Sequence, residues 1–110
     1  MTMDENQFDG LAEATLNHLL DVIDDELGDV LEVDMENGML TIEAETGGLY
    51  IINKHGPNRQ IWMSSPLSGA SHYDFDEASQ SWVDSRGEER LMTRLAGELS
   101  RMTGSSISLD

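Results

Sequence analysis

The N-terminal part of the chain shows the periodicity of one amphipathic helix from Asp4 to Leu27. Its apolar positions recur at intervals of three and four residues, which is the spacing of a single helical stripe. They are Phe8, Ala12, Leu16, Leu19, Ile23 and Leu27. The polar positions that share another side, expected roughly opposite this stripe, are Asp9, Glu13, Asn17, Asp21 and Asp24. Gly28 is expected to end the helix.

Short segments with period-two alternation follow the helix. Residues 31–36 alternate apolar and acidic side chains, and Asn37-Gly38 separates them from a second alternating segment at 39–45. An Asn-Gly pair between two such segments is typical of a β-hairpin with one packed face. Further strands are expected where β-branched and aromatic residues concentrate between glycine and proline turns. The expected strands are 31–36, 39–45, 49–53, 60–64, 72–76 and 81–84.

A second helix is predicted near the C-terminus, with glycine before and after it. Its apolar positions are Leu91, Leu95, Leu99 and Met102. The polar residues 104–110 are expected to form a fraying tail, although Ile107 and Leu109 could dock on the core. We therefore predict one domain over residues 1–103, followed by a tail over 104–110.

The order of elements limits the architecture. Two helices with one apolar stripe each must bury it, and a meandering sheet with one apolar face offers the matching surface. The predicted fold is an α/β (α+β) two-layer sandwich, with two helices packed on one face of an antiparallel five- to six-stranded sheet. The other face of the sheet is left to solvent or to a partner.

Charge is distributed unevenly along the 110 residues. Six Lys and Arg residues against 22 Asp and Glu residues give a formal net charge of −16. Residues 1–50 hold 14 acids and no Lys or Arg, whereas residues 51–73 hold no acid. This field repels phosphate, so nucleic acid is not an expected partner. It attracts cations or a basic protein surface, although acids can also serve solubility alone.

Composition argues against several classes of function. The chain has no cysteine, which excludes disulfides, thiolate metal sites and a cysteine nucleophile. It shows neither a nucleophile elbow nor a glycine-rich phosphate loop, so we do not expect a hydrolase or a nucleotide-binding enzyme. Apolar runs such as 49–52 are far shorter than the roughly 20 residues that cross a bilayer. With an acidic N-terminus, we expect no membrane span, no targeting segment and a cytoplasmic protein.

Carboxylates at the end of the first helix and on the first strand are candidate metal ligands. Their oxygens suit hard cations such as Fe(III), and Fe(II) accepts them together with water. The acids that could share one edge are Asp21, Asp24, Asp25, Asp29, Glu32 and Asp34. His18 could add a nitrogen ligand, although a lone histidine on a helix flank is more often only solvated.

The acid-free centre of the chain holds a different set of candidates. If the apolar residues between them face the helices, Gln60, Trp62 and Ser64 face the open side of the sheet. A tryptophan exposed among polar residues is a typical anchor for a protein partner. The alternative is that Trp62 packs locally under Pro57 or Pro66 as part of the scaffold.

The centre of the chain strongly resembles the signature of the frataxin family. The matching stretch covers residues 50–73 and reads YIINKHGPNRQIWMSSPLSGASHY, with INK, PN-x-QIW, SSP and SG in register. The order of elements matches over almost the whole chain, and the short form resembles the bacterial type. Three departures are present. His55 stands where the family usually has Gln, residues 70–72 replace a stretch with Pro and a basic residue, and Asn17 stands where an acid is frequent.

The resemblance implies an iron-binding accessory protein of iron–sulfur cluster assembly, which contacts a cysteine desulfurase and its scaffold protein. The implied ligands of weakly bound iron (Fe2+ or Fe3+) are Glu13, Asp21, Asp24, Asp25, Asp29, Glu32 and Asp34. The implied partner surface comprises Asn53, Lys54, Gln60, Trp62 and Ser64. We expect a monomer, with iron-dependent oligomers as the alternative.

Two other functions compete with this interpretation. A ferroxidase or iron-storage protein would need paired metals held by Glu and His, and the sequence has no Glu-x-x-His pair. A purely regulatory protein would use its acids only as charge. Stoichiometric dioxygen consumption would distinguish a ferroxidase from an accessory protein. Binding to desulfurase in the absence of metal would distinguish a purely regulatory protein from an iron-binding one.

Overall fold

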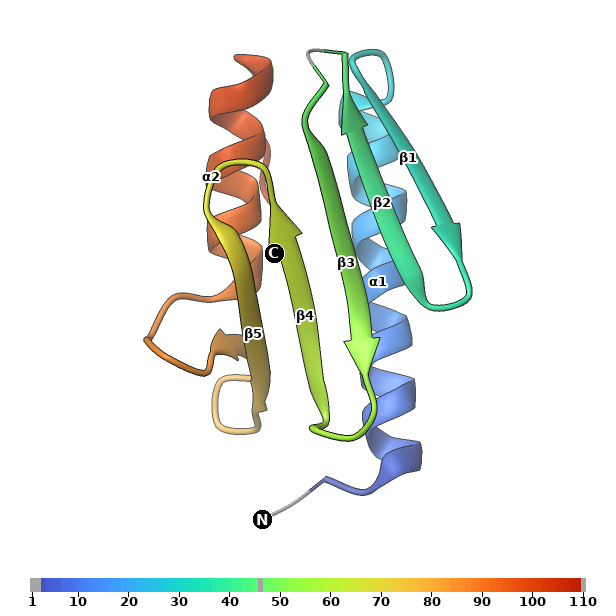
Figure 1. Cartoon of the computed structure of the whole chain (residues 1–110), viewed down its shortest axis with the longest axis vertical. Coiled ribbons are helices and arrows are strands. Elements are labelled where there is room, and N and C mark those ends of the chain that lie inside the picture. The colour runs from blue at the N-terminus through green and yellow to red at the C-terminus, as the bar shows by residue number, and fades with distance from the viewer. Residues whose placement is uncertain (1–2, 46, 110) are drawn as a thin grey trace.

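The computed structural model describes residues 3–45 and 47–109. Over this part of the chain, two helices and six strands follow one another in the predicted order (Figure 1). Their bounds are α1 Glu5–Leu27, β1 Leu31–Glu36, β2 Met39–Ala44, β3 Leu49–His55, β4 Gln60–Ser65, β5 Gly69–Asp76, β6 Ser81–Asp84 and α2 Leu91–Thr103. None of the helices in the described part is long and apolar enough to cross a membrane.

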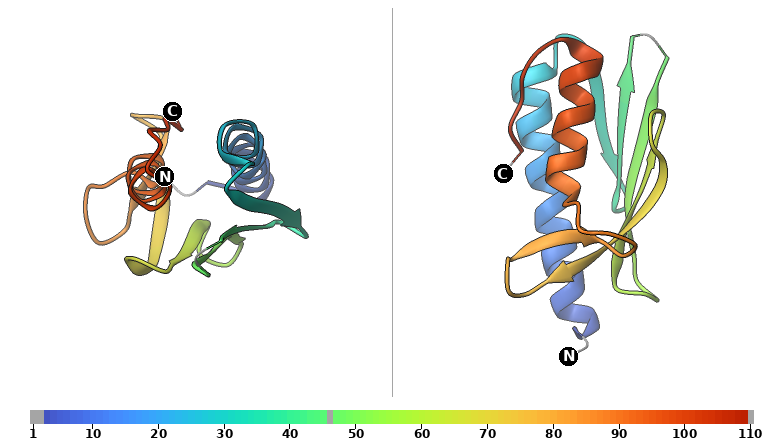
Figure 2. Two further views of the ribbon diagram at one scale, coloured as in Figure 1. Left: turned by 90° about the horizontal axis from the view of Figure 1, so that it is seen from above. Right: turned by 90° about the vertical axis from the view of Figure 1, so that its left-hand side faces the viewer.

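The strands form one antiparallel sheet in which each strand pairs with its neighbours in the chain, from β1 to β6. Figure 2 shows both helices on the same face of this sheet, side by side. The predicted two-layer sandwich is therefore confirmed, and the opposite face of the sheet carries no helix in the described part of the chain.

Helix α1 forms for reasons that are visible in its sequence. Asp4 and Gln7 make a capping box, in which Asp4 Oδ1 accepts from the Gln7 backbone N–H at 2.8 Å and Gln7 Oε1 accepts from the Asp4 backbone N–H at 3.3 Å. All six apolar positions of the predicted stripe are buried, and the helix ends at Gly28 as expected. The stripe belongs to the hydrophobic core, together with buried residues of the sheet, of α2 and of the C-terminal tail.

The hairpin of β1 and β2 also follows its sequence signal. Asn37 and Gly38 have φ values of 52° and 76°, the left-handed conformation that a two-residue hairpin turn of type I′ requires. Strand pairing starts directly beside the turn, at Glu36 and Met39. Except for the exposed Met39, this register turns the apolar side chains of both strands toward the helices, and it turns the acids toward the open face.

Several expectations about element ends and side-chain positions are corrected. Strand β5 begins at Gly69, three residues earlier than expected, because Gly69 already pairs with Ser65 across the turn. Strand β2 ends at Ala44 instead of residue 45, and β3 and β4 extend to His55 and Ser65, beyond the expected ends at 53 and 64. The C-terminal tail does not fray, since Ile107 is 8% exposed and Leu109 is 1% exposed. Long-range packing, which local periodicity does not report, holds these two side chains.

The acidic side of α1 is a flank beside the sheet, and the expectation that it lies opposite the buried stripe is wrong at its N-terminal end. Lys54 Nζ of β3 contacts Asp9 Oδ1 at 3.4 Å and Glu13 Oε1 at 3.2 Å. The reason is the 100° step of the helix, which places these two acids next to the stripe. The hydrogen bond to Glu13 raises the pKa of Lys54.

Candidate functional site

An acidic ridge follows the end of α1, the connection to β1 and the first half of β1. We define it by Asp21, Asp24, Asp25, Asp29, Glu32 and Asp34. All six side chains are exposed, and none of the ion pairs within the described residues involves them. The predicted ligand Glu13 is also exposed, but it lies apart from the ridge and pairs with Lys54.

The ridge is a surface of separate carboxylates. Within residues 3–45 and 47–109, no three His, Asp or Glu side chains converge as a ready metal cage. A hollow at one end of the ridge is lined by Asp29, Glu32, Glu43 and Glu45. Glu32 and Glu43 are direct cross-strand partners, an arrangement of like charges that costs stability. A bound cation would relieve this repulsion.

Glu43 and Glu45 were not among the predicted site residues. The signal that could have found them is the hairpin register, because a two-residue turn at 37–38 places Glu43 opposite Glu32. His18, considered as an additional ligand, makes a contact with the C-terminal tail. Its Nε2 is hydrogen-bonded to the backbone carbonyl of Leu109 at 2.8 Å, so this ring helps to hold the C-terminal tail on α1.

The open face of the sheet contains four of the five predicted partner residues. Period-two alternation with the buried Ile61 and Met63 places the polar positions of β4 on this face. The four are Asn53, Gln60, Trp62 and Ser64. Lys54 is on the other side of β3, paired with α1, so it does not belong to the open face. The expected grouping of Lys54 with that face is corrected by the same alternation rule.

Trp62 lies at the centre of a stack of three rings on the open face. The ring centroids of His55 and Trp62 lie 3.8 Å apart, with an interplanar angle of 9°. On the other side of the indole, the ring centroids of Trp62 and His72 lie 4.2 Å apart, with an interplanar angle of 16°. The indole Nε1–H donates to Gln60 Oε1 at 2.9 Å, and Gln60 Nε2 donates to Asp74 Oδ1 at 3.0 Å. The half-buried Trp62 is thus fixed in one orientation. The sequence prediction named neither histidine as a neighbour of this ring.

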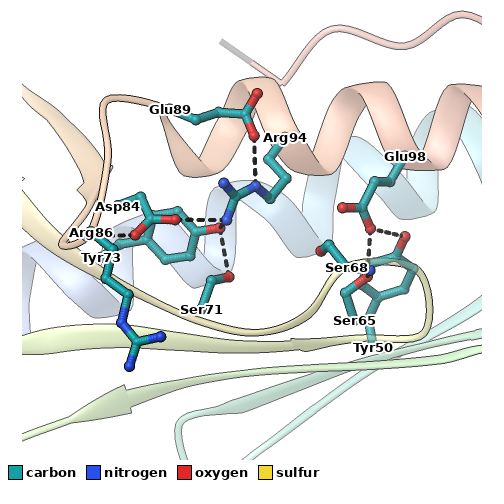
Figure 3. A network of polar contacts seen from close by, with 10 residues as sticks. All are labelled: Tyr50, Ser65, Ser68, Ser71, Tyr73, Asp84, Arg86, Glu89, Arg94 and Glu98. Carbon is teal, nitrogen blue, oxygen red and sulfur yellow. Dashed lines mark hydrogen bonds and ion pairs between the residues drawn. The ribbon is translucent and has the colours of Figure 1, made fainter.

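The helix side of the sheet carries two polar networks that hold α2 in place (Figure 3). In the first, the carboxylate of Glu98 accepts from the Tyr50 hydroxyl at 2.8 Å and from Ser65 Oγ at 2.5 Å. Burial would raise the pKa of Glu98, but hydrogen bonds from Ser65, Ser68 and Tyr50 outweigh it and lower that pKa. Burial, followed by the bond to Glu98, raises the pKa of Tyr50 well above its ordinary value.

The second network ties α2 to the end of β6. Arg94 Nη1 donates to Asp84 Oδ2 at 2.9 Å and to the Tyr73 hydroxyl at 2.9 Å, and Arg94 Nε donates to Glu89 Oε1 at 2.6 Å. The Arg86 backbone N–H, followed by Arg94, lowers the pKa of Asp84. Both networks fix the sheet that presents Trp62, and neither was predicted from the sequence.

Comparison with known sequences gives a consistent result. The family described as frataxin-like domain matches residues 1–105. The mitochondrial frataxin of Arabidopsis thaliana is 40% identical over 97% of this chain, which spans 59% of that relative. The iron–sulfur cluster assembly protein CyaY of Pseudomonas fluorescens (strain SBW25) is 37% identical over 100% of this chain and 98% of its own length.

Solved structures agree with this result. The frataxin from Psychromonas ingrahamii superposes with a TM-score of 0.87 at 25% identity, covering 98% of this chain and 99% of that one. Trimeric frataxin from the yeast Saccharomyces cerevisiae, complexed with ferrous, gives a TM-score of 0.77 at 31% identity, covering 96% and 90%. The fold, the signature on β3 to β5 and the sequence relatives agree, and the chain belongs to the frataxin family.

Proposed function

We propose that this protein is an iron-binding accessory protein of iron–sulfur cluster assembly. It carries iron as cargo on the acidic ridge and contacts the cysteine desulfurase and scaffold protein through the open face of the sheet. The observation that supports this most is that two different surfaces adjoin each other. Exposed carboxylates of the acidic ridge lie on α1 and β1, and beside them lies the sheet face with the fixed, half-buried Trp62.

The ridge supports weak, exchangeable iron binding. Separate exposed carboxylates bind a hydrated ion through one or two oxygens each and leave water in its other positions. The unpaired acids raise the local cation concentration, and the opposed Glu32 and Glu43 are a point where a bound cation would relieve repulsion. An ion held in this way can be passed to a partner, which fits a carrier better than a store.

The open face supports docking of a protein. Trp62 has a large apolar ring whose orientation is fixed before binding, so little side-chain entropy is lost when a partner covers it. Exposed apolar residues lie on the same face, including Met39 at 41% and Leu49 at 43% exposure. The names of the bacterial relatives, iron–sulfur cluster assembly protein, point to partners from that pathway. The trimeric yeast relatives make oligomers the alternative to a monomer.

Iron binding by the ridge is tested with Fe(II) under anaerobic conditions by equilibrium dialysis. The Asp24→Asn/Asp25→Asn variant is expected to bind iron about threefold more weakly or worse, because it loses two of the six ridge charges. The control is Glu77→Gln/Glu88→Gln, which removes the same charge from exposed positions outside the ridge. Equal affinity of the two variants would reject the ridge as the iron site.

Docking through the open face is tested by the affinity for a cysteine desulfurase–scaffold complex. Trp62→Ala is expected to lose about 30-fold or more, the effect of removing an interface hot spot of about 2 kcal/mol. Leu67→Ala is the control, because it removes an apolar side chain that is 56% exposed in the β4–β5 connection. A loss equal to that of the control would reject the face as the docking surface.

A further inference from the structure

A hollow lies at the edge of the sheet where β5 meets the segment that follows β6. Its lining includes Ser71, His72, Asp84, Arg86 and Arg94. His72 is also the outer ring of the Trp62 stack, so the hollow adjoins the open face. In a chain with a net charge of −16, it gathers three basic side chains around one acid.

The acid in this hollow is already occupied. Asp84 Oδ2 accepts from Arg94, and Asp84 Oδ1 accepts from the Arg86 backbone N–H at 2.8 Å. Arg94 is further committed to Glu89 on the helix side. Both oxygens of Asp84 therefore already accept a hydrogen bond, and within residues 3–45 and 47–109 Arg86 is the lining arginine that pairs with no acid.

The Arg86 guanidinium and the His72 imidazole are the uncommitted groups. Within residues 3–45 and 47–109, neither side chain takes part in a hydrogen bond or an ion pair. Figure 3 shows the Arg86 side chain directed away from Arg94 and Glu89, toward the strands. The main chain fixes their separation, because the Ser85 N–H donates to the His72 carbonyl at 2.8 Å.

We propose that this hollow binds a carboxylate, supplied by an acidic side chain on a loop of the assembly partner. The inference rests on the proposed function and adds a second contact point beside Trp62. A guanidinium offers paired N–H donors that match the two oxygens of a carboxylate, and the imidazole adds a donor from the neighbouring strand. A cationic partner surface would instead be repelled here and attracted by the acidic ridge.

The imidazole of His72 lies between the Trp62 indole and this hollow. The charged groups that face His72 are Arg86 and Arg94, with Asp84 already paired to Arg94. Along β5, Asp74 is held by Gln60. The other ring of the stack, His55, does not line the hollow.

The first test uses acetate as the carboxylate probe and the full chain. Acetate replaces chloride at constant ionic strength and constant pH, while NMR follows the side-chain signals of His72 and Arg86. Both signals are expected to shift and saturate, and Arg86→Gln should weaken the effect about threefold or more. Arg101→Gln, with the same charge change on α2, should leave it unchanged. Shifts that do not saturate, or that survive Arg86→Gln, overturn the proposal.

The second test uses the affinity for the cysteine desulfurase–scaffold complex. Arg86→Gln is expected to bind this complex about threefold more weakly than the wild type, because it loses the guanidinium that would pair with the partner's carboxylate. Arg101→Gln, with the same charge change on α2, is expected to bind like the wild type. Equal affinities of the two variants overturn the inference while leaving the proposed function intact. If the complex does not bind the wild type, the proposed function fails, and the acetate test still decides whether the hollow takes a carboxylate.

Discussion

The Tyr50→Phe substitution tests how α2 is held on the sheet. It removes one hydroxyl and leaves the buried ring in place. The lost interaction is the 2.8 Å hydrogen bond from Tyr50 to the carboxylate of Glu98, a group that is only 2% exposed. A hydrogen bond to a charged group contributes about 1.5–3 kcal/mol, so we expect the free energy of unfolding to fall by that amount.

The pH dependence of stability gives this prediction its sign. Because the pKa of Tyr50 is raised in the folded state, its contribution is fully present below pH 10 and is lost as the pH rises above that value. The Tyr50→Phe variant should therefore lose less stability than the wild type on the alkaline side. The pKa of Glu98 is lowered, so its contribution is present at neutral pH and is lost as the pH falls below about 4.

Urea denaturation across this pH range is the assay. A double-mutant cycle with Glu98→Gln isolates the contact, and we expect a coupling free energy of about 1 kcal/mol or more. A loss below about 0.5 kcal/mol for Tyr50→Phe, together with an unchanged alkaline slope, would refute the reasoning, because ordinary surface substitutions give changes of that size.

Three further predictions concern the two tryptophans, the ridge and the second network. Trp62→Ala should cost less than about 1.5 kcal/mol of stability, whereas Trp82→Ala, at a side chain 3% exposed, should cost about 3–5 kcal/mol; equal losses in urea denaturation would contradict this. The thermal midpoint should rise with salt and with divalent cations, and rise less in Asp24→Lys/Asp25→Lys; calorimetry showing no rise in the wild type would disprove self-repulsion. The lowered pKa of Asp84 means that its contribution is lost as the pH falls through the acid range. Asp84→Asn should therefore flatten acid unfolding, and an unchanged acid limb would count against the Arg94 pair.

Much of the fold was predictable because local patterns determine it. The helical stripe of α1 and the period-two alternation of the strands each have one solution that buries their apolar side chains, and the Asn37-Gly38 turn fixes the first register. The resemblance on residues 50–73 then gave the family. The docked tail was less accessible, since Leu109 is held by packing and by a contact with a residue far away in the sequence.

The site was predictable only in part. The alternation that placed Trp62 on the open face also excludes Lys54 from it, so this correction was within reach of the sequence. The ring of His72 meets Trp62 because the turn after Ser65 sets the pairing of β4 and β5, which composition does not reveal. Glu98 interrupts the apolar pattern of α2 and is buried only because Tyr50 and Ser65 supply its hydrogen bonds.

The most direct test of the central claim is cysteine desulfurase turnover in the presence of the scaffold protein, measured with and without this protein in iron-free and iron-supplemented buffer. Wild-type protein is expected to change the turnover, and folded Trp62→Ala at the same concentration is expected to change it far less, because the docking anchor is gone. Iron should alter the effect of the wild type and not that of Asp24→Asn/Asp25→Asn. Turnover that is unaffected by the wild type, or affected equally by Trp62→Ala, would contradict the account.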